Sequence, residues 1–147
     1  MRFEYSTEIT RPAAEVFAFL SHHPNHTKIV KQNAKSEQLD PGPMKVGTRV
    51  RNTARFLWLD MVETFEVTEL EESRTLAKRS LPGSTFETSD RFEVEETPNG
   101  ARVRLVVTGT PHGTGQRVLF RLLGPAFDKA FADILPRLKS VLESERN

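Results

Sequence analysis

The chain has 147 residues, a length typical of one domain with a full hydrophobic core, and we expect that domain to span residues 1–147. Its 21 basic and 20 acidic residues almost cancel, which gives no indication of nucleic-acid binding, and the lack of cysteine excludes disulfides and thiolate metal sites. No apolar run approaches the roughly 20 residues that cross a bilayer, so we expect no stable membrane insertion. The N-terminus has no apolar signal core, so we expect a cytoplasmic location. We expect the protein to be a monomer or a homodimer.

The N-terminal part of the chain predicts one strand followed by two short helices. Residues 2–9 alternate larger side chains with glutamate and serine, which is typical of a half-buried strand. Pro12 lies in the first turn of the next helix, where its missing N–H costs nothing. Residues 21–25 interrupt that helix, and Pro24 begins a second one. The apolar residues of the two helices are Val16, Phe17, Leu20, Ile29 and Val30.

The middle of the chain predicts six further strands separated by turns. Pro41-Gly42, Pro82-Gly83 and Asn99-Gly100 are turn dipeptides, and the last of them is a strong hairpin signal. Apolar residues alternate with charged ones within the strands, so each strand has one apolar face. The expected strands are residues 33–39, 46–58, 60–70, 74–81, 84–96 and 101–110.

The C-terminal stretch from about residue 114 to 145 predicts a long amphipathic helix. Its apolar residues recur at steps of four and three, which places them on one face. Gly124-Pro125 should break or kink this helix, dividing 115–123 from 125–145, and Pro136 should bend it again because the Ala132 carbonyl loses its partner. A helix with such a stripe needs a partner surface, and the preceding strands supply a sheet. The stripe is Leu119, Leu123, Phe127, Phe131, Ile134, Leu138 and Leu142.

The order of these elements, together with seven short segments, resembles the polyketide cyclase/dehydrase branch of the START-like (SRPBCC, Bet v 1-like) superfamily. The resemblance implies an α+β helix-grip fold, in which a curved seven-stranded antiparallel sheet surrounds a long C-terminal helix and two short helices lie between the first two strands. Two positions depart from the common pattern: His23-Pro24 replaces Asp-Pro, and Ile29 replaces a tryptophan. The similar segments are 9–17, 23–25, 46–50, 65–70, 92–94, 99–103 and 135–139.

Members of this superfamily cyclise polyketides, carry lipids or quinones, or bind hormones, so the resemblance implies a ligand without identifying it. The leading hypothesis is binding of a small hydrophobic or aromatic molecule, which is polyketide-, lipid- or quinone-like, in a cavity between the sheet and the C-terminal helix. The alternatives are a polyketide cyclase or dehydratase acting by acid/base catalysis, and a ligand-free interaction module that delivers a quinone-like lipid to a membrane partner.

Strand periodicity predicts which polar side chains face the helix. If the apolar face of each strand points inward, five polar residues share that face. They could orient a ligand carbonyl or hydroxyl; in the enzymatic alternative, Glu63 or Asp90 acts as the base while Lys78 or Asn52 polarises a carbonyl. The remaining interpretation is that they point outward at a bulge or form structural ion pairs. The five residues are Asn52, Glu63, Lys78, Thr88 and Asp90.

Apolar residues on the same faces are the expected lining of the cavity. Trp58 and Phe86 complete the aromatic residues that could contribute to it. The competing interpretation is that these rings fill a solid core, as aromatic residues at such spacings usually do. The expected ligand-binding residues, besides Asn52 and Thr88, are Phe17, Val50, Phe56, Phe65, Phe92, Leu123, Phe127 and Phe131.

The histidines do not predict a metal site. His22, His23 and His26 lie close together in the sequence, but no cysteine or nearby acidic residue completes a zinc ligand set, and Pro24 disturbs the helical spacing. We therefore expect these histidines on a solvent-exposed loop or at the rim of a pocket, and His112 on the surface. The glycine-rich segments lack the spacing of a phosphate-binding loop, so no cofactor is expected.

Overall fold

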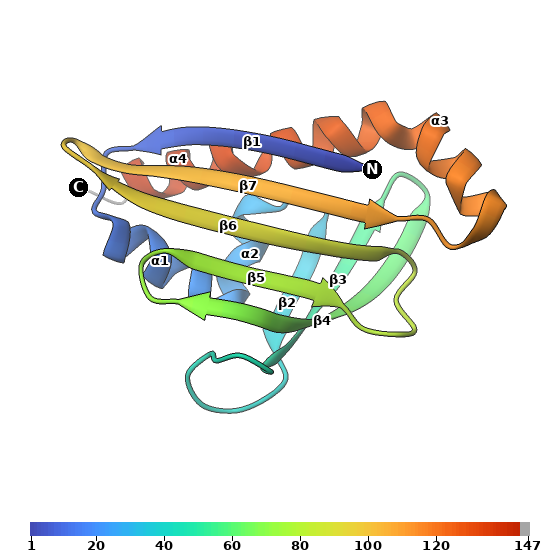
Figure 1. Ribbon diagram of the computed structural model, residues 1–147, viewed down its shortest axis with the longest axis horizontal. Coiled ribbons are helices and arrows are strands. Elements are labelled where there is room, and N and C mark those ends of the chain that lie inside the picture. The colour runs from blue at the N-terminus through green and yellow to red at the C-terminus, as the bar shows by residue number, and fades with distance from the viewer. Residues whose placement is uncertain (145–147) are drawn as a thin grey trace.

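Seven strands form one antiparallel sheet in the order β1-β7-β6-β5-β4-β3-β2. From β2 to β7 each strand pairs with the next one along the chain. The first strand, β1, lies instead against the last strand, β7, at one edge of the sheet (Figure 1). The computed structural model describes residues 1–144. The strands are β1 (Arg2–Ile9), β2 (Asn33–Gln38), β3 (Arg49–Phe56), β4 (Leu59–Glu71), β5 (Thr75–Ser80), β6 (Glu87–Thr97) and β7 (Gly100–Thr110).

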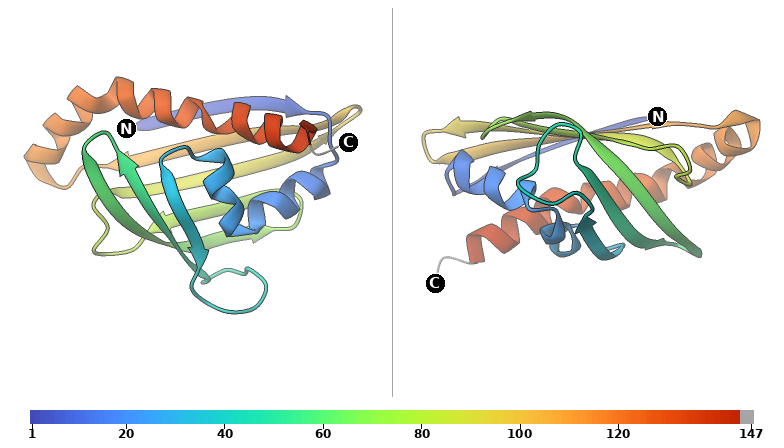
Figure 2. Two further views of the ribbon diagram at one scale, coloured as in Figure 1. Left: turned by 180° about the vertical axis from the view of Figure 1, so that it is seen from behind. Right: turned by 90° about the horizontal axis from the view of Figure 1, so that it is seen from below.

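The helices all lie on one side of this sheet, and β3 and β4 curve towards them (Figure 2). Between β1 and β2 the chain forms α1 (Ala13–Ser21), a 3-10 turn η1 (His23–Asn25) and α2 (His26–Ile29). After β7 come α3 (Gly113–Ala132) and α4 (Ile134–Ser144). The helix-grip fold expected from the sequence is therefore confirmed. The predicted last residue of the long helix, Glu145, lies outside the described residues.

The long helix is interrupted at a different residue from the one that its sequence predicts. The expected break at Gly124-Pro125 is wrong, because α3 runs through both residues without interruption. Arg121, whose carbonyl loses its helical partner at Pro125, is an exposed residue of α3. The interruption falls instead at Asp133, three residues before Pro136, which is the effect expected of that proline.

Two clusters of buried apolar residues occupy the space between helices and sheet. The larger one joins α1 and α4 to the central strands, and Phe17, Leu105 and Leu138 are among its fully enclosed members. The smaller one lies under α3 and consists of Phe56, Phe86, Phe120, Phe127 and Ala130. In the predicted stripe, Ile134, Leu138 and Leu142 of α4 are buried, but Leu119 and Leu123 of α3 are only half-buried. The α4 half is thus fixed in the main core, and the α3 half is held mainly by aromatic rings.

The turn between β6 and β7 requires glycine at its tightest point. Gly100 has a φ of +155°, and a Cβ atom there would lie 2.1 Å from the carbonyl oxygen of Ile9. The end of β1 therefore approaches this turn so closely that only a residue without a side chain fits.

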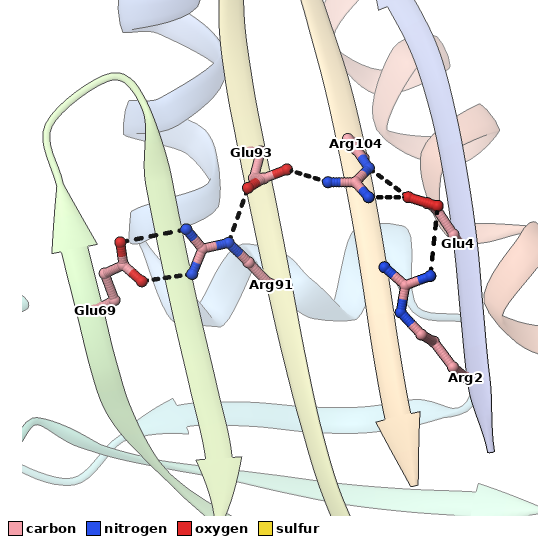
Figure 3. A network of polar contacts seen from close by, with 6 residues as sticks. All are labelled: Arg2, Glu4, Glu69, Arg91, Glu93 and Arg104. Carbon is pink, nitrogen blue, oxygen red and sulfur yellow. Dashed lines mark hydrogen bonds and ion pairs between the residues drawn. The ribbon is translucent and has the colours of Figure 1, made fainter.

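An ion-pair network crosses the outer, convex face of the sheet (Figure 3). Arg91 contacts both Glu69 of β4 and Glu93 of its own strand, and Arg104 of β7 bridges Glu93 and Glu4 of β1. These hydrogen bonds lower the pKa of Glu93. Arg91 reaches β4 across β5 because the intervening residue of its row is the small Ala77. The six members are Arg2, Glu4, Glu69, Arg91, Glu93 and Arg104.

Candidate functional site

A cavity of about 180 Å³ lies between the concave face of the sheet and the C-terminal helices. Its lining comes from β2 to β7 together with α2, α3 and α4, and is mostly apolar. An engineered apolar cavity of about 150 Å³ holds one benzene molecule, whereas pockets for drug-sized ligands measure roughly 300–1,000 Å³. The cavity in this conformation therefore has room for one aromatic ring. The space between sheet and helix is not completely filled by side chains.

One end of the cavity is bounded by the aromatic residues of the smaller core cluster. The rings of Phe56 and Phe127 are stacked, with centroids 4.6 Å apart and planes 6° from parallel. Phe86 and Phe120 meet Phe127 edge-on, at 5.7 and 5.8 Å. Phe131 lies 6.2 Å beyond it in a second stacked contact. These rings limit the size of the cavity, so a ligand larger than one ring requires some of them to move.

An ion pair lies in the sheet side of the cavity lining. Lys78 of β5 and Asp90 of β6 are direct cross-strand neighbours, and Lys78 Nζ donates a hydrogen bond to Asp90 Oδ1 over 2.9 Å. The Lys78 side chain is only 3% exposed, and its ammonium lies 5.7 Å from the ring centroid of Phe92. Removing either partner would leave the other as an unpaired charge in the cavity lining, which is costly at a buried position.

His23 and His26 are buried, so their expected position on an exposed loop or pocket rim is wrong. Their side chains are 0% and 3% exposed, and His26 lines the cavity. Both point inward with Ile29, three residues further on, because η1 and α2 continue one helical face. That spacing of three is the sequence signal that would have indicated burial. His112, by contrast, is exposed and hydrogen-bonds Glu87, as expected for a surface residue.

Burial keeps both inner histidines neutral. It lowers the pKa of His23 to about 3, with a further contribution from the Lys78 charge. It also holds the pKa of His26 well below its ordinary value, again with Lys78 as the second cause. His26 Nε2 donates to the Leu20 carbonyl oxygen over 2.9 Å, and since a carbonyl can only accept, the neutral ring carries its proton there and a lone pair on Nδ1. His23 Nε2 pairs with Asn52 Oδ1 at 2.8 Å.

Glu63 of β4 completes the polar part of the lining. Both of its carboxylate oxygens accept the backbone N–H of Thr85, at 3.1 and 3.2 Å, so the carboxylate fixes the loop between β5 and β6. Burial raises the pKa of Glu63, and its hydrogen bonds with Ser84 and Thr85 act in the opposite direction. Asn52 is its direct neighbour on β3. Glu63 is therefore a buried carboxyl that already has donors within the protein.

The structure brings ten of the thirteen residues expected to form the site into one lining. They are Asn52, Phe56, Glu63, Phe65, Lys78, Thr88, Asp90, Phe92, Phe127 and Phe131. The other three lie elsewhere. Phe17 is packed in the larger core cluster and borders an open hollow beside α1, Val50 is fully enclosed in β3, and Leu123 packs on the aromatic cluster.

Two prominent members of the lining were not predicted from the sequence, and two aromatic residues considered for it have different outcomes. His26 and Phe120 were not expected there, and Phe86 was considered only as one of several aromatic residues. Phe120 lies seven residues before Phe127, so it shares one helix face with Phe127 and the buried Ala130, and that spacing is the sequence signal that would have found it. Trp58, considered as a lining residue, is 66% exposed at the turn between β3 and β4, so that interpretation is wrong.

Neither a membrane helix nor a metal-ligand cluster is found in the part of the chain that the structure describes. No helix within residues 1–144 is long and apolar enough to cross a bilayer. Over the same residues, no three His, Asp, Glu or Cys side chains are grouped so that they could hold a metal ion.

Solved structures with the same fold come from several bacteria. The protein TTHA0849 from Thermus thermophilus has a TM-score of 0.80 at 16% identity, with 100% of both chains covered. The Zhui aromatase/cyclase from Streptomyces sp. R1128 has a TM-score of 0.73 at 15% identity, covering 99% of this chain and 96% of that one. A START superfamily protein from Mycobacterium smegmatis has a TM-score of 0.67 at 15% identity, covering 98% and 95%. At these identities the likeness concerns the fold.

Sequence comparison gives the family. No curated protein matches the chain. A family model described as "Polyketide cyclase / dehydrase and lipid transport" matches residues 1–143, which is nearly the whole chain. The matched region includes every strand and helix that forms the cavity. The chain therefore belongs to the polyketide cyclase/dehydrase and lipid transport family.

Proposed function

We propose that this protein binds a small, uncharged aromatic or otherwise hydrophobic molecule in the cavity between the sheet and α3. The observation that carries this proposal is a mostly apolar cavity of about 180 Å³ whose lining also contains polar groups, among them Asn52, Glu63 and Lys78. Such a combination is characteristic of ligand sites, in which apolar walls supply affinity and a few polar groups fix orientation. A larger polyketide-, lipid- or quinone-like ligand would displace Phe56 or Phe127.

The family supports a hydrophobic ligand. Its description names polyketides and lipid transport, and one protein of the same fold is called an aromatase/cyclase. The family description and this name both indicate apolar or aromatic ligands, which are poorly soluble in water. A cytoplasmic location, a monomeric or homodimeric state and the lack of nucleic-acid binding stay predictions from the sequence.

A direct test is binding of toluene, a one-ring probe that matches the cavity in size. We expect it to raise the melting temperature progressively as its concentration exceeds its Kd, and to shift the NMR signals of the lining residues. The matched variants are Ala130→Leu, which adds bulk inside the cavity, and Ala132→Leu, which makes the same change at an exposed position of the same helix. Ala130→Leu should abolish binding while Ala132→Leu leaves it intact. A failure of toluene and of larger apolar probes to bind would instead favour a ligand-free interaction module.

Acid/base catalysis is the second candidate, and the raised pKa of Glu63 favours it. A carboxyl with such a pKa could take a proton from a carbon next to a ligand carbonyl, while Lys78 polarises the carbonyl oxygen. Asp90 is less suited to act as the base, because its carboxylate is engaged with Lys78. Glu63→Gln separates binding from catalysis: it should keep toluene binding, and should abolish cyclisation or dehydration of a poly-β-ketone analogue if Glu63 is the base. Unchanged turnover would exclude that role.

A further inference from the structure

His26 offers a neutral hydrogen-bond acceptor in the lining of the cavity. His26 lines the cavity, and its Nε2–H is committed to the Leu20 carbonyl. The remaining ring nitrogen, Nδ1, therefore carries a lone pair and can only accept a hydrogen bond. The ring is held by the edge-on contact with Phe92, at 6.1 Å between centroids, and by the adjacent His23 ring at 4.5 Å. A ligand that satisfies His26 must bring a donor.

The same part of the cavity offers a hydrogen-bond donor. An ammonium group has three N–H bonds, and within residues 1–144 Asp90 accepts one of those of Lys78. Lys78 lines the cavity and lies against the same Phe92 ring, with Nζ 5.7 Å from its centroid. His26 and Lys78 thus both line the cavity and both lie against the ring of Phe92. A ligand that satisfies both must accept as well as donate.

The charges around these two groups restrict the ligand further. A carboxylate or phosphate would place a second negative charge beside Asp90 and near Glu63, in surroundings that are already poorly hydrated. A protonated amine would be repelled by Lys78. A ketone or ether can accept from Lys78 but has no hydrogen for His26. A neutral hydroxyl group both donates and accepts, so it alone among these groups pairs with both residues.

The rest of the lining selects the molecule that carries this hydroxyl. Phe56, Phe86, Phe92 and Phe127 surround a space sized for one ring. We propose that the cavity recognises a neutral one-ring phenol, whose hydroxyl donates to His26 Nδ1 and accepts from Lys78 Nζ while its ring lies among the phenylalanines. This inference rests on the proposed function, because it assigns the ligand class of the same cavity.

The test compares phenol, anisole and toluene, which share one ring but differ in the hydrogen bonds that they can make. Phenol can satisfy both residues, anisole only Lys78, and toluene neither. Each net hydrogen bond contributes roughly threefold to tenfold in affinity, so phenol, with two, should bind at least about tenfold more tightly than toluene, with anisole between them. Titrations followed by NMR or calorimetry measure the three dissociation constants.

Two variants assign the preference to its residues. His26→Gln should lower the affinity for phenol to that for anisole without changing the affinity for toluene. Lys78→Met combined with Asp90→Asn, which avoids an unpaired buried charge, should remove the advantage of anisole over toluene. His112→Gln, a matched change at an exposed histidine, should alter none of the three constants. In the wild-type protein, the nitrogen-15 signal of His26 Nδ1 should move upfield with phenol and not with toluene, a readout that does not depend on variant folding.

The outcomes separate this inference from the proposed function. Toluene binding without a phenol preference, or a phenol preference that survives both variants, would overturn the recognition by His26 and Lys78 and leave hydrophobic binding in place. An unmoved His26 nitrogen signal with bound phenol would have the same meaning. Failure of all three probes to bind would overturn the proposed function together with this inference.

Discussion

The two inner histidines make a specific prediction about acid stability. The pKa of His23 is lowered to about 3 and that of His26 well below its ordinary value, mainly because both rings are buried. In the unfolded chain each would titrate near about 6.5. Below that pH the unfolded state binds more protons than the folded state, so acidification favours unfolding. The stabilisation is fully present above about pH 6.5 and is lost as the pH falls towards the folded pKa.

The magnitude follows from the pKa of His23 in the two states. With a folded pKa of about 3 and an unfolded pKa of roughly 6.5, the free energy of unfolding should be about 2 kcal/mol lower at pH 5 than at pH 7. His26 adds a contribution of the same sign. Glu63 opposes them, because a raised folded pKa makes protonation of the folded state easier as the pH falls. The pKa values of Asp40 and Glu143 are held near 2 by their hydrogen bonds, so they titrate below this range.

Urea denaturation between pH 5 and 7 measures this dependence. The free energy of unfolding of the wild-type protein should rise with pH at a slope approaching about 1.4 kcal/mol per pH unit for each buried histidine. His23→Gln should remove roughly half of the slope, whatever it does to the stability at pH 7. Phe127→Leu is the control, since it lowers stability without removing a titrating group. A slope equal to that of wild type in His23→Gln, or a flat profile in wild type, would refute the assignment of neutral, buried imidazoles.

Two further predictions concern the cavity boundary and the β6–β7 turn. Phe127→Ala removes a ring packed against four others, so it should lower the free energy of unfolding in urea by about 3–5 kcal/mol. The space that it leaves should let naphthalene bind. Leu122→Ala, on the exposed side of α3, should change the free energy of unfolding by no more than about 0.5 kcal/mol. Equal losses in the two variants would contradict the packing of Phe127. Gly100→Ala should cost more than about 1 kcal/mol, because its Cβ meets the Ile9 carbonyl, while Gly115→Ala, in open space within α3, should gain up to about 1 kcal/mol in the same assay. A neutral Gly100→Ala would show that the turn can shift freely.

The sequence was sufficient for the fold and for most of the polar lining. Strand alternation has a period of two, so knowing that Phe92 faces inward also fixes Asp90 and Thr88. The same reasoning brought Asn52, Glu63 and Lys78 to one wall, although these residues come from three strands. Their role in binding or catalysis stays a prediction, because geometry alone does not test it.

The errors share a physical origin in long-range packing. The amphipathic pattern of α1 indicates that Phe17 is buried, but it does not say which space that ring fills. His23 and His26 are polar residues in a very short helical segment, where burial depends on Asn52 and the Leu20 carbonyl as partners. Local propensity predicts an interruption at Pro125, but α3 continues through it, and Arg121, whose carbonyl loses its helical partner there, is an exposed residue.

The ion-pair network has a consequence for how this scaffold tolerates change. Its six charged residues lie on the convex face, and none of them lines the cavity on the opposite face. Strands β1, β4, β6 and β7 are thus tied together by ion pairs that contain no residue of the cavity lining. Cavities lower stability, and proteins sit only slightly above the threshold at which they fold. Because the network and the cavity share no residue, a substitution in the cavity lining leaves these ion pairs between the strands in place.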